Sequence, residues 1–370
     1  NSSAIRAMFE EGNRLAGIYG AENVFDFSLG NPNVPAPEAV KNAIIEIVND
    51  TDPVALHGYT NSNCGYAEVR EAVAKSLNER FDTHFEGKNI VMTVGAAGGL
   101  NVILKAIINP GDEVIAFAPY FGEYNNYVAN FDGVMVVVPA DVPSFQLDLE
   151  TFAKKITAKT KAVIVNNPNN PTGTVVDSEE LKEFIHKVPK DIIIVVDEAY
   201  IELSSNPDVK SMVSEISDDT NVVVARTFSK LYGLAGVRLG YAMCNKEMHA
   251  ILQKCTSVFT GSRVALAGAM AALDDEEYIK KTKAAMLEGR KYLTDEFTKM
   301  GFYVYPSETN FLYVNTGYNA AEFAEECKKY GLIIRGNFEY SRITVGRMDQ
   351  NEKMVGIVKK IIESGELKKI

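Results

Sequence analysis

The first candidate for chemistry is a lysine that stands among hydroxyl groups, an arginine and glycines. The segment 225–240 reads ARTFSKLYGLAGVRLG and contains Thr227, Ser229, Lys230 and Arg238. A lysine amine is a potential nucleophile, and an arginine beside two hydroxyl groups is a potential binding site for an anion. Taken alone, Lys230 is better explained as a solvated surface residue, because lysine is rarely buried. A chemical role for Lys230 therefore requires other candidate site residues elsewhere in the chain.

Two other segments place polar side chains directly after apolar runs. Residues 165–173 read VNNPNNPTG and predict a rigid loop that contains Asn170, although an ordinary turn explains this segment equally well by itself. Residues 192–200 read IIIVVDEAY and place Asp197, and then Tyr200, after an apolar run. A carboxylate at the end of a buried strand is costly unless it is paired, and the alternative role for it is a helix cap.

A glycine-rich turn is a candidate site for an anion. Gly95, Ala96 and Ala97 follow the apolar run 90–93 and precede a predicted helix at 100–108. Main-chain N–H groups at the start of a helix attract anions, so this turn could bind a phosphate. A nicotinamide-dependent oxidoreductase uses a similar turn, but the GxGxxG spacing is absent, and no acidic residue follows about 20 residues later at a strand end. The pattern disfavours that alternative.

The elements that must position these residues alternate between strands and helices. Apolar, β-branched runs predict strands at 90–93, 113–117, 134–138, 162–165, 192–196, 222–225 and 239–243, with helices such as 100–108 and 178–186 between them. This alternation is typical of a mainly parallel sheet covered by helices. Ligands of such α/β proteins bind outside the carboxyl ends of the strands, which is where Lys230, Asp197 and Asn170 fall.

The pattern changes beyond about residue 247. Long helices are expected at 246–272 and 275–300, followed by apolar strands at 311–314, 332–335 and 342–346 and by a C-terminal helix. We expect residues 1–45 to form an N-terminal arm and part of a small domain. Residues 46–250 are expected to form the large ligand-binding domain, and residues 251–370 an interdomain helix and the small C-terminal domain.

The composition favours a small-molecule partner. The 370 residues carry a net charge of −11, which disfavours a surface for nucleic acid, and no window approaches the roughly 18 apolar residues of a membrane helix. The four cysteines form no CxxC pair and the four histidines show no metal-ligand spacing. We therefore expect a cytoplasmic protein that binds neither nucleic acid, membrane nor metal.

The motifs NPTG at 170–173, DEAY at 197–200 and SK at 229–230, with Arg238 eight residues after the lysine, resemble those of the fold-type I pyridoxal-phosphate-dependent aminotransferases of class I/II. The resemblance covers nearly the whole chain and is closest to the aspartate and histidinol-phosphate aminotransferase branches. It implies an aspartate-aminotransferase-like α/β fold. In that fold, a large domain with a mostly parallel seven-stranded sheet binds the cofactor, and a smaller α+β domain is built from the N- and C-terminal segments.

The resemblance also implies roles for single residues. Lys230 would carry pyridoxal 5′-phosphate as a Schiff base and shuttle the proton of the substrate. Asp197 would pair with the pyridinium nitrogen, while Tyr200 and Asn170 would bind the phenolic oxygen. The remaining cofactor contacts implied are a ring that stacks on the pyridine, Phe121, and the phosphate ligands Gly95, Ala96, Ala97, Thr227, Ser229 and Arg238. Asn170 would also contact the substrate.

Other implied roles concern the substrate and a second subunit. Tyr59 matches a tyrosine that reaches the cofactor phosphate of the partner subunit, which implies a homodimer. Arg342 matches an arginine that holds the substrate α-carboxylate, although a strand-end surface arginine is the simpler explanation of that residue alone. Gly30 and Asn310 lie in segments similar to the substrate side of the family. Arg335 matches an arginine that meets the substrate phosphate in the histidinol-phosphate branch.

The implied reaction is a ping-pong transfer of the amino group of an L-amino acid to a 2-oxo acid. A decarboxylase or a β-lyase on the same fold and cofactor is the alternative, because these enzymes share the cofactor residues. A regulator that keeps the fold without catalysis is disfavoured, since the acidic chain has no residues to spare for a DNA-binding domain. Aspartate, histidinol phosphate or another anionic donor remain open, because Arg335 favours the phosphate whereas FSLGNPNVPAP at 27–37 resembles the aspartate-type proteins.

Overall fold

The computed structural model describes residues 4–32, 34–59 and 65–370, with side chains from residue 7 onward. The chain divides into two compact units. The large unit comprises residues 35–170 and 175–280, and the small unit comprises residues up to 34, residues 171–174 and residues 281–370. Each unit is described by itself below.

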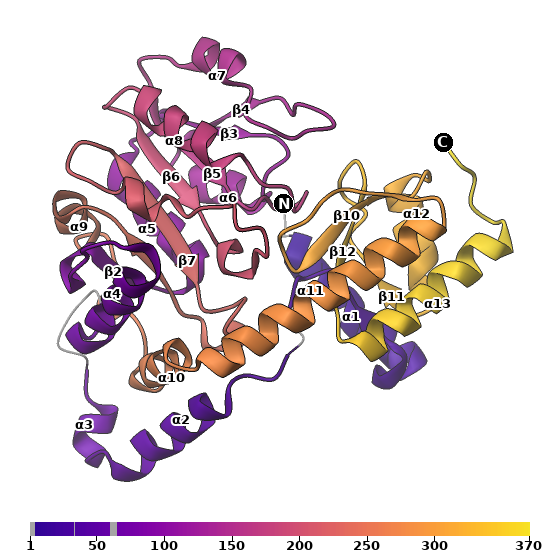
Figure 1. The fold of residues 1–370 in the computed structure, drawn as a ribbon, viewed down its shortest axis with the longest axis horizontal. Coiled ribbons are helices and arrows are strands. Elements are labelled where there is room, and N and C mark those ends of the chain that lie inside the picture. The colour runs from indigo at the N-terminus through magenta and orange to yellow at the C-terminus, as the bar shows by residue number, and fades with distance from the viewer. Residues whose placement is uncertain (1–3, 33, 60–64) are drawn as a thin grey trace. The chain divides into compact units, whose positions relative to one another are not determined.

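The large unit is built on a seven-stranded sheet with the strand order β2-β8-β7-β6-β5-β3-β4 (Figure 1). Strands β7, β6, β5, β3 and β4 are parallel to one another, and β8 is antiparallel to both β2 and β7. This arrangement confirms the predicted α/β class and the mostly parallel sheet. The strands are β2 (Ile90–Thr93), β3 (Glu113–Phe117), β4 (Val134–Val138), β5 (Thr160–Asn166), β6 (Ile193–Asp197), β7 (Val222–Thr227) and β8 (Gly240–Met243).

Helices cover the sheet of the large unit and bury its central strands. Every residue of β2, β7 and β8 is buried, including the polar residues Arg226 and Thr227 of β7. Leu100, Ile103 and Leu104 of α5 pack with strand residues such as Val195 and Val223 in one core. The helices of this unit that surround the sheet are α4 (Ala67–Phe81), α5 (Gly95–Ile107), α6 (Glu123–Ala129), α7 (Leu149–Lys155), α8 (Ser178–Lys187) and α9 (Lys246–Leu252).

Two predicted helices have different boundaries in the structure. The single helix expected at 246–272 is wrong, because α9 ends at Leu252 and α10 (Arg263–Leu273) begins anew. Gly261 has a φ of 85°, which a helix cannot contain, and the Ser262 side chain caps α10 by accepting the N–H of Ala265 at 3.1 Å. Helix α5 begins five residues before the predicted Leu100, since glycine and alanine at its start carry no apolar periodicity.

Helix α10 packs on α2 (Glu38–Asp50) within the large unit, and α3 (Pro53–His57) follows α2. Gly268 permits this approach, because a Cβ there would lie 3.2 Å from the Val40 side chain. The structure therefore groups residues 35–45 and 251–280 with the sheet, whereas the boundaries expected from the sequence were 45 and 250.

The small unit joins the two ends of the chain. Strand β1 (Phe25–Asp26) pairs in parallel with β11 (Leu332–Ile333), and a second, antiparallel sheet has the order β12-β10-β9. This pairing confirms the expected small α+β part built from N- and C-terminal segments. The other elements of the unit are α1 (Ala4–Tyr19), residues 281–299 of α11 (Glu276–Lys299), β9 (Tyr303–Val304), β10 (Phe311–Asn315), α12 (Ala320–Lys329), β12 (Ser341–Thr344) and α13 (Met348–Ser364).

One core holds the small unit together. Leu293 and Phe297 of α11 pack with Phe323 of α12, Val358 of α13 and Leu312 of β10. In the part of the chain that the structure describes, no helix is both long and apolar enough to cross a membrane.

Two leucines of α11 provide a test of this core. Leu293 is fully buried, whereas Leu287 is 48% exposed. Leu293→Ala should lower the free energy of unfolding of the small unit by about 2–5 kcal/mol, because it leaves a cavity in a close-packed core. Urea denaturation followed by circular dichroism measures this change. Leu287→Ala is the control and should be close to wild type; equal losses for the two variants would contradict the assignment of the core.

Candidate functional site

The carboxylate of Asp197 lies buried at the carboxyl end of β6, with an exposed fraction of 5%. The Tyr124 hydroxyl donates a hydrogen bond to Oδ2 at 2.6 Å, and the Ala199 N–H donates to Oδ1 at 3.1 Å. Burial raises the pKa of Asp197 above its usual value, while the two hydrogen bonds and the charge of Lys230 oppose that rise. A cationic ligand group beside this carboxylate would favour its charged form.

Sequence reasoning missed Tyr124 as a site residue. Its side chain is fully buried, and burial together with the nearby Asp197 carboxylate holds the pKa of its hydroxyl well above the ordinary value. Tyr124 is therefore a permanent hydrogen-bond donor to Asp197. The ring of the predicted Phe121 contacts Tyr124 edge-on, with centroids 5.6 Å apart, so the two aromatic residues of one segment lie next to each other.

The loops that follow β5, β6 and β7 meet at one edge of the sheet. The Asn170 Nδ2 donates to the Tyr200 hydroxyl at 3.2 Å, and the Asn170 main-chain N–H donates to the Asn166 side chain at 2.7 Å. Asn166 in turn donates to the main-chain oxygen of Asp197 at 2.9 Å. The Lys230 Nζ lies 5.4 Å from the centroid of the Tyr200 ring. The structure thus brings together the lysine, aspartate, tyrosine and asparagine that the motifs singled out.

The predicted anion-binding side chains also form a connected group. Thr227 donates to the Ser229 hydroxyl at 2.8 Å, and Arg238 donates to the same hydroxyl at 3.3 Å. A Cβ on Gly95 would lie 2.7 Å from Nη2 of Arg238, so this guanidinium rests against the bare main chain where α5 begins. Gly95 also has a φ of 69°, which favours glycine.

The start of α5 completes this group. Val94, at the N-cap, makes no side-chain cap, and the first turn of the helix has no acidic residue. A Cβ on Gly240 would lie 2.6 Å from the Gly95 carbonyl carbon and 2.9 Å from the Ala96 nitrogen, so β8 and α5 meet main chain to main chain. Hydroxyl groups, a guanidinium and helix N–H groups are the donors that a phosphate prefers. With the buried carboxylate of Asp197, the residues fit the phosphate and ring nitrogen of the expected cofactor.

The small unit gathers the residues expected on the substrate side. Arg342 is 2% exposed, and its guanidinium donates to the main-chain oxygen of Ser28 and lies 4.7 Å from the centroid of Phe311. The main chain of Gly30 donates to the Thr344 hydroxyl at 3.0 Å and accepts from the Asn310 amide at 2.8 Å. Gly30 and Asn310 therefore lie in the same part of the unit as β12, which carries Arg342.

Arg335 and Arg342 are opposite each other across an antiparallel bridge. They exchange two main-chain hydrogen bonds, of 3.1 and 2.9 Å, so their side chains project from the same face. Arg335 is 7% exposed, donates to Asn337 at 3.2 Å, and lies over the ring of Phe338 at 5.0 Å. Two guanidinium groups on one face bring positive charge and several N–H donors in a fixed planar geometry. This pair is suited to an anionic ligand.

Tyr59 differs from the other predicted residues because its side chain is 84% exposed. Its ring stacks on Phe259, with centroids 4.5 Å apart and planes 20° from parallel. Contact with the site of a second subunit stays a prediction.

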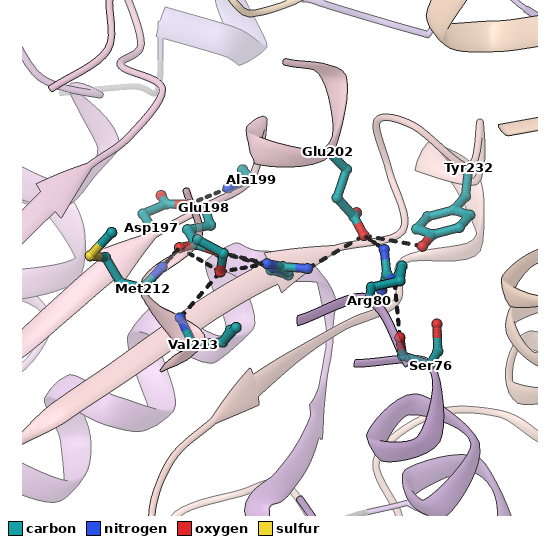
Figure 2. A network of polar contacts seen from close by, with 11 residues as sticks. Ser76, Arg80, Asp197, Glu198, Ala199, Glu202, Met212, Val213 and Tyr232 are labelled. Atoms are coloured by element: carbon teal, nitrogen blue, oxygen red, sulfur yellow. Dashed lines mark hydrogen bonds and ion pairs between the residues drawn. The ribbon is translucent and has the colours of Figure 1, made fainter. Parts of the chain in front are cut away.

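A buried ion pair next to the site was also missed by sequence reasoning. Arg226 is fully buried on β7 and donates to Glu198 Oε2 through Nε at 3.0 Å and Nη2 at 2.9 Å (Figure 2). Ser211 donates to the same carboxylate at 2.8 Å, and the Met212 N–H donates to it at 2.6 Å. An arginine inside the apolar strand VVVART was the signal in the sequence, because a buried charge requires a partner.

Most of the chain matches a known protein family and several curated relatives. Residues 22–358 match the family model described as aminotransferase class I and II. The chain is 32% identical to the histidinol-phosphate aminotransferase of Moorella thermoacetica, over 90% of this chain and 83% of the relative. It is 35% identical to the histidinol-phosphate aminotransferase of Brevibacillus brevis, over 79% of this chain and 82% of the relative.

Two solved structures have the same fold. The aspartate aminotransferase of Thermotoga maritima superposes with a TM-score of 0.88 and 25% identity, over 98% of each chain. The histidinol-phosphate aminotransferase of Sinorhizobium meliloti, in complex with pyridoxal-5′-phosphate, superposes with a TM-score of 0.85 and 25% identity, over 95% of this chain and 94% of that chain.

The Glu198–Arg226 pair generates a stability prediction. Arg226→Met should lower the free energy of unfolding of the large unit by about 3–5 kcal/mol, because it leaves the Glu198 carboxylate buried without its cation. Chemical denaturation measures the loss. Lys154→Met removes one member of an exposed ion pair with Glu150 in the same unit and should change stability little. A loss for Arg226→Met no larger than for Lys154→Met would show that the buried pair is not required.

Proposed function

The chain belongs to the class I and II aminotransferases, and from this premise we propose that it moves the amino group of an anionic amino donor, foremost histidinol phosphate, to a 2-oxo acid. The curated relatives are aminotransferases, so the alternative of a decarboxylase or a β-lyase is not favoured. The observation that carries the choice of an anionic donor is the pair of buried arginines, Arg335 and Arg342, on one face of the small unit.

The enzyme depends on pyridoxal phosphate, which when bound supplies an electron-withdrawing ring that stabilises negative charge at the α-carbon of the amino acid. Lys230 would hold the cofactor through its amine, and Asn170 and Tyr200 would donate to the ring oxygen. Asp197 would bind the ring nitrogen and keep it protonated, because its carboxylate is buried and needs a positive partner. Tyr124 would orient that carboxylate through its hydrogen bond to Oδ2.

The phosphate would bind at the start of α5. The Ser229 hydroxyl already lies within hydrogen-bond distance of both the Arg238 guanidinium and the Thr227 hydroxyl, and the N–H groups of residues 95–97 begin the helix. We infer that Phe121 covers the ring, since it contacts the tyrosine that binds Asp197.

Lys230 and the arginines of the small unit would have different roles toward the substrate, proton transfer for the lysine and anion binding for the arginines. The Lys230 Nζ would take the proton from the substrate α-carbon and deliver it to the C4′ carbon of the cofactor, because it is the amine among the residues that meet at the strand ends. Arg342 would hold the α-carboxylate with two parallel hydrogen bonds, and Arg335 would hold the second anionic group of the donor. Gly30 and Asn310 would shape the neighbouring main chain.

A homodimer and a cytoplasmic location are part of this proposal. Tyr59 and Phe259 stack on each other and are both exposed on the large unit, and exposed apolar surface favours contact with a second copy. Tyr59 would then reach the phosphate site of the partner. Cys244, Cys255 and Cys327 are free thiols, as expected in a reducing compartment, while Cys64 lies outside the described residues.

The function is tested with purified enzyme loaded with pyridoxal phosphate. Histidinol phosphate, aspartate and glutamate are added separately, and the visible absorption of the cofactor and the matching keto product are followed. We expect histidinol phosphate to bleach the band fastest, with one keto product per site in the absence of a 2-oxo acid. Bleaching without a keto product would indicate another reaction, and faster turnover of a neutral donor such as alanine would contradict the anionic specificity.

Arg335 should determine selectivity. Arg335→Gln should lower kcat/KM for histidinol phosphate by about 10–100-fold relative to alanine, because one charge-assisted interaction with the donor is lost. Steady-state kinetics with both donors measure this ratio. Arg347→Gln, at an exposed arginine of the same unit, is the control and should leave the ratio unchanged. An unchanged ratio in Arg335→Gln would refute the assignment of this residue.

A further inference from the structure

The carboxylate of Glu202, near the proposed site in the sequence, is contacted by three side chains (Figure 2). It is located on a short 3-10 helix, Ile201–Leu203, and its Oε1 accepts from Arg80 at 2.7 Å and from the Tyr232 hydroxyl at 3.1 Å. The Nη1 of Arg226 lies 3.5 Å from the same oxygen. Together with Glu198, these residues form a network with two acidic and two basic groups, whose charges balance; Glu198 and Arg226 are buried, and Arg80 lies at the solvent edge.

Four members of this network, all except Arg80, lie within two residues of the proposed cofactor site in the sequence. Glu198 follows Asp197, and Arg226 precedes Thr227. Because successive side chains of a strand point to opposite faces, such neighbours place the site on one face and the network on the other. Glu202 lies two residues after Tyr200, and Tyr232 lies two residues after Lys230. The network is therefore in a position to hold the strand-end loops after β6 and β7, which carry Tyr200 and Lys230.

Tyr232 holds the loop that carries Lys230 in the core of the large unit. This tyrosine is fully buried, and its ring packs on Phe228 with centroids 5.1 Å apart, so the residues on either side of Lys230 are held in the core. Main-chain bonds from Gly233 to the Lys230 oxygen and from Leu234 to the Phe228 oxygen, both 3.1 Å, close the turn.

The direction of the Tyr232–Glu202 hydrogen bond is fixed by charge. Although burial opposes ionisation of Glu202, the nearby Arg80 and Arg226 guanidinium groups lower the pKa of this carboxyl below its usual value. Burial and the Glu202 charge raise the pKa of the Tyr232 hydroxyl well above its usual value. Tyr232 therefore donates and Glu202 accepts. Hydrogen bonds to an ionised acceptor are stronger than neutral ones.

We propose that Glu202 is a positioning residue, which acts through the Tyr232 hydroxyl to place the Lys230 amine at the aldehyde carbon of the cofactor. This inference rests on the proposed function. The bond that depends on this placement forms when Nζ of Lys230 condenses with the aldehyde and one water leaves. The phosphate group and ring would bind through other residues, so the network should affect covalent attachment more than it affects non-covalent binding.

Two forms of the cofactor separate these effects. Pyridoxal phosphate can bond to Lys230, whereas pyridoxamine phosphate carries an amine in place of the aldehyde and cannot. In Tyr232→Phe, which removes one hydroxyl, we expect the affinity for pyridoxal phosphate to fall about tenfold, the loss of one hydrogen bond to a charged group. The dissociation constant of the same variant for pyridoxamine phosphate should stay within about twofold of the wild-type value. Equilibrium dialysis measures both dissociation constants, and stopped-flow absorption measures the rate of attachment.

Tyr241→Phe is the matched control. Tyr241 is a fully buried tyrosine directly opposite Arg226 on the neighbouring strand, and its ring packs on the same Phe228 as that of Tyr232, with centroids 5.5 Å apart. The Tyr241→Phe variant should leave the ratio of the affinities for pyridoxal phosphate and pyridoxamine phosphate unchanged. Equal weakening of both cofactor forms in Tyr232→Phe, or no weakening of either, would overturn the proposal. If wild-type protein itself bound no pyridoxal phosphate covalently, the proposed function would fail first, so the two failures are distinguishable.

Discussion

The burial of the Asp197 carboxylate is the constraint on which the rest of the site depends. A carboxylate at the end of an apolar strand loses its hydration and must be compensated by hydrogen bonds or by positive charge. Tyr124 supplies one hydrogen bond at 2.6 Å, and Asn166 binds the main-chain oxygen of the same residue. These contacts join residues at or after the ends of β3, β5 and β6. The Asp197 carboxylate would then bind the positively charged ring nitrogen of the cofactor.

Charge is arranged in three groups, two in the large unit and one in the small unit. The start of α5 and Arg238 present donors for an anion, and the network behind the sheet balances two acids against two arginines. The small unit presents two arginines on one face, with Arg342 almost completely buried. The balanced network contributes rigidity without changing the net charge at the strand ends, whereas two arginines on one face of the small unit concentrate positive charge that favours an anionic ligand.

Much of the fold and of the site could be predicted from the sequence, because uninterrupted apolar runs mark buried strands and polar residues that follow them mark the ligand edge. Lys230, Asp197 and Asn170 were found in this way. Tyr124 and Arg226 were missed because their partners lie on other strands, and such contacts depend on the strand order of the sheet. The early start of α5 was missed because glycine and alanine show no periodicity, and the break before α10 because Gly261 and Ser262 interrupt a run that otherwise looks helical.

The most direct test of the central claim is chemical trapping of the cofactor. Purified enzyme loaded with pyridoxal phosphate is reduced with borohydride, which makes the bond to the lysine permanent, and the modified peptide is identified by mass spectrometry. We predict one pyridoxyl group per chain, on Lys230 in the segment 225–240. Modification of another lysine, or of none, would contradict the assignment of the strand ends of the large unit as the cofactor site.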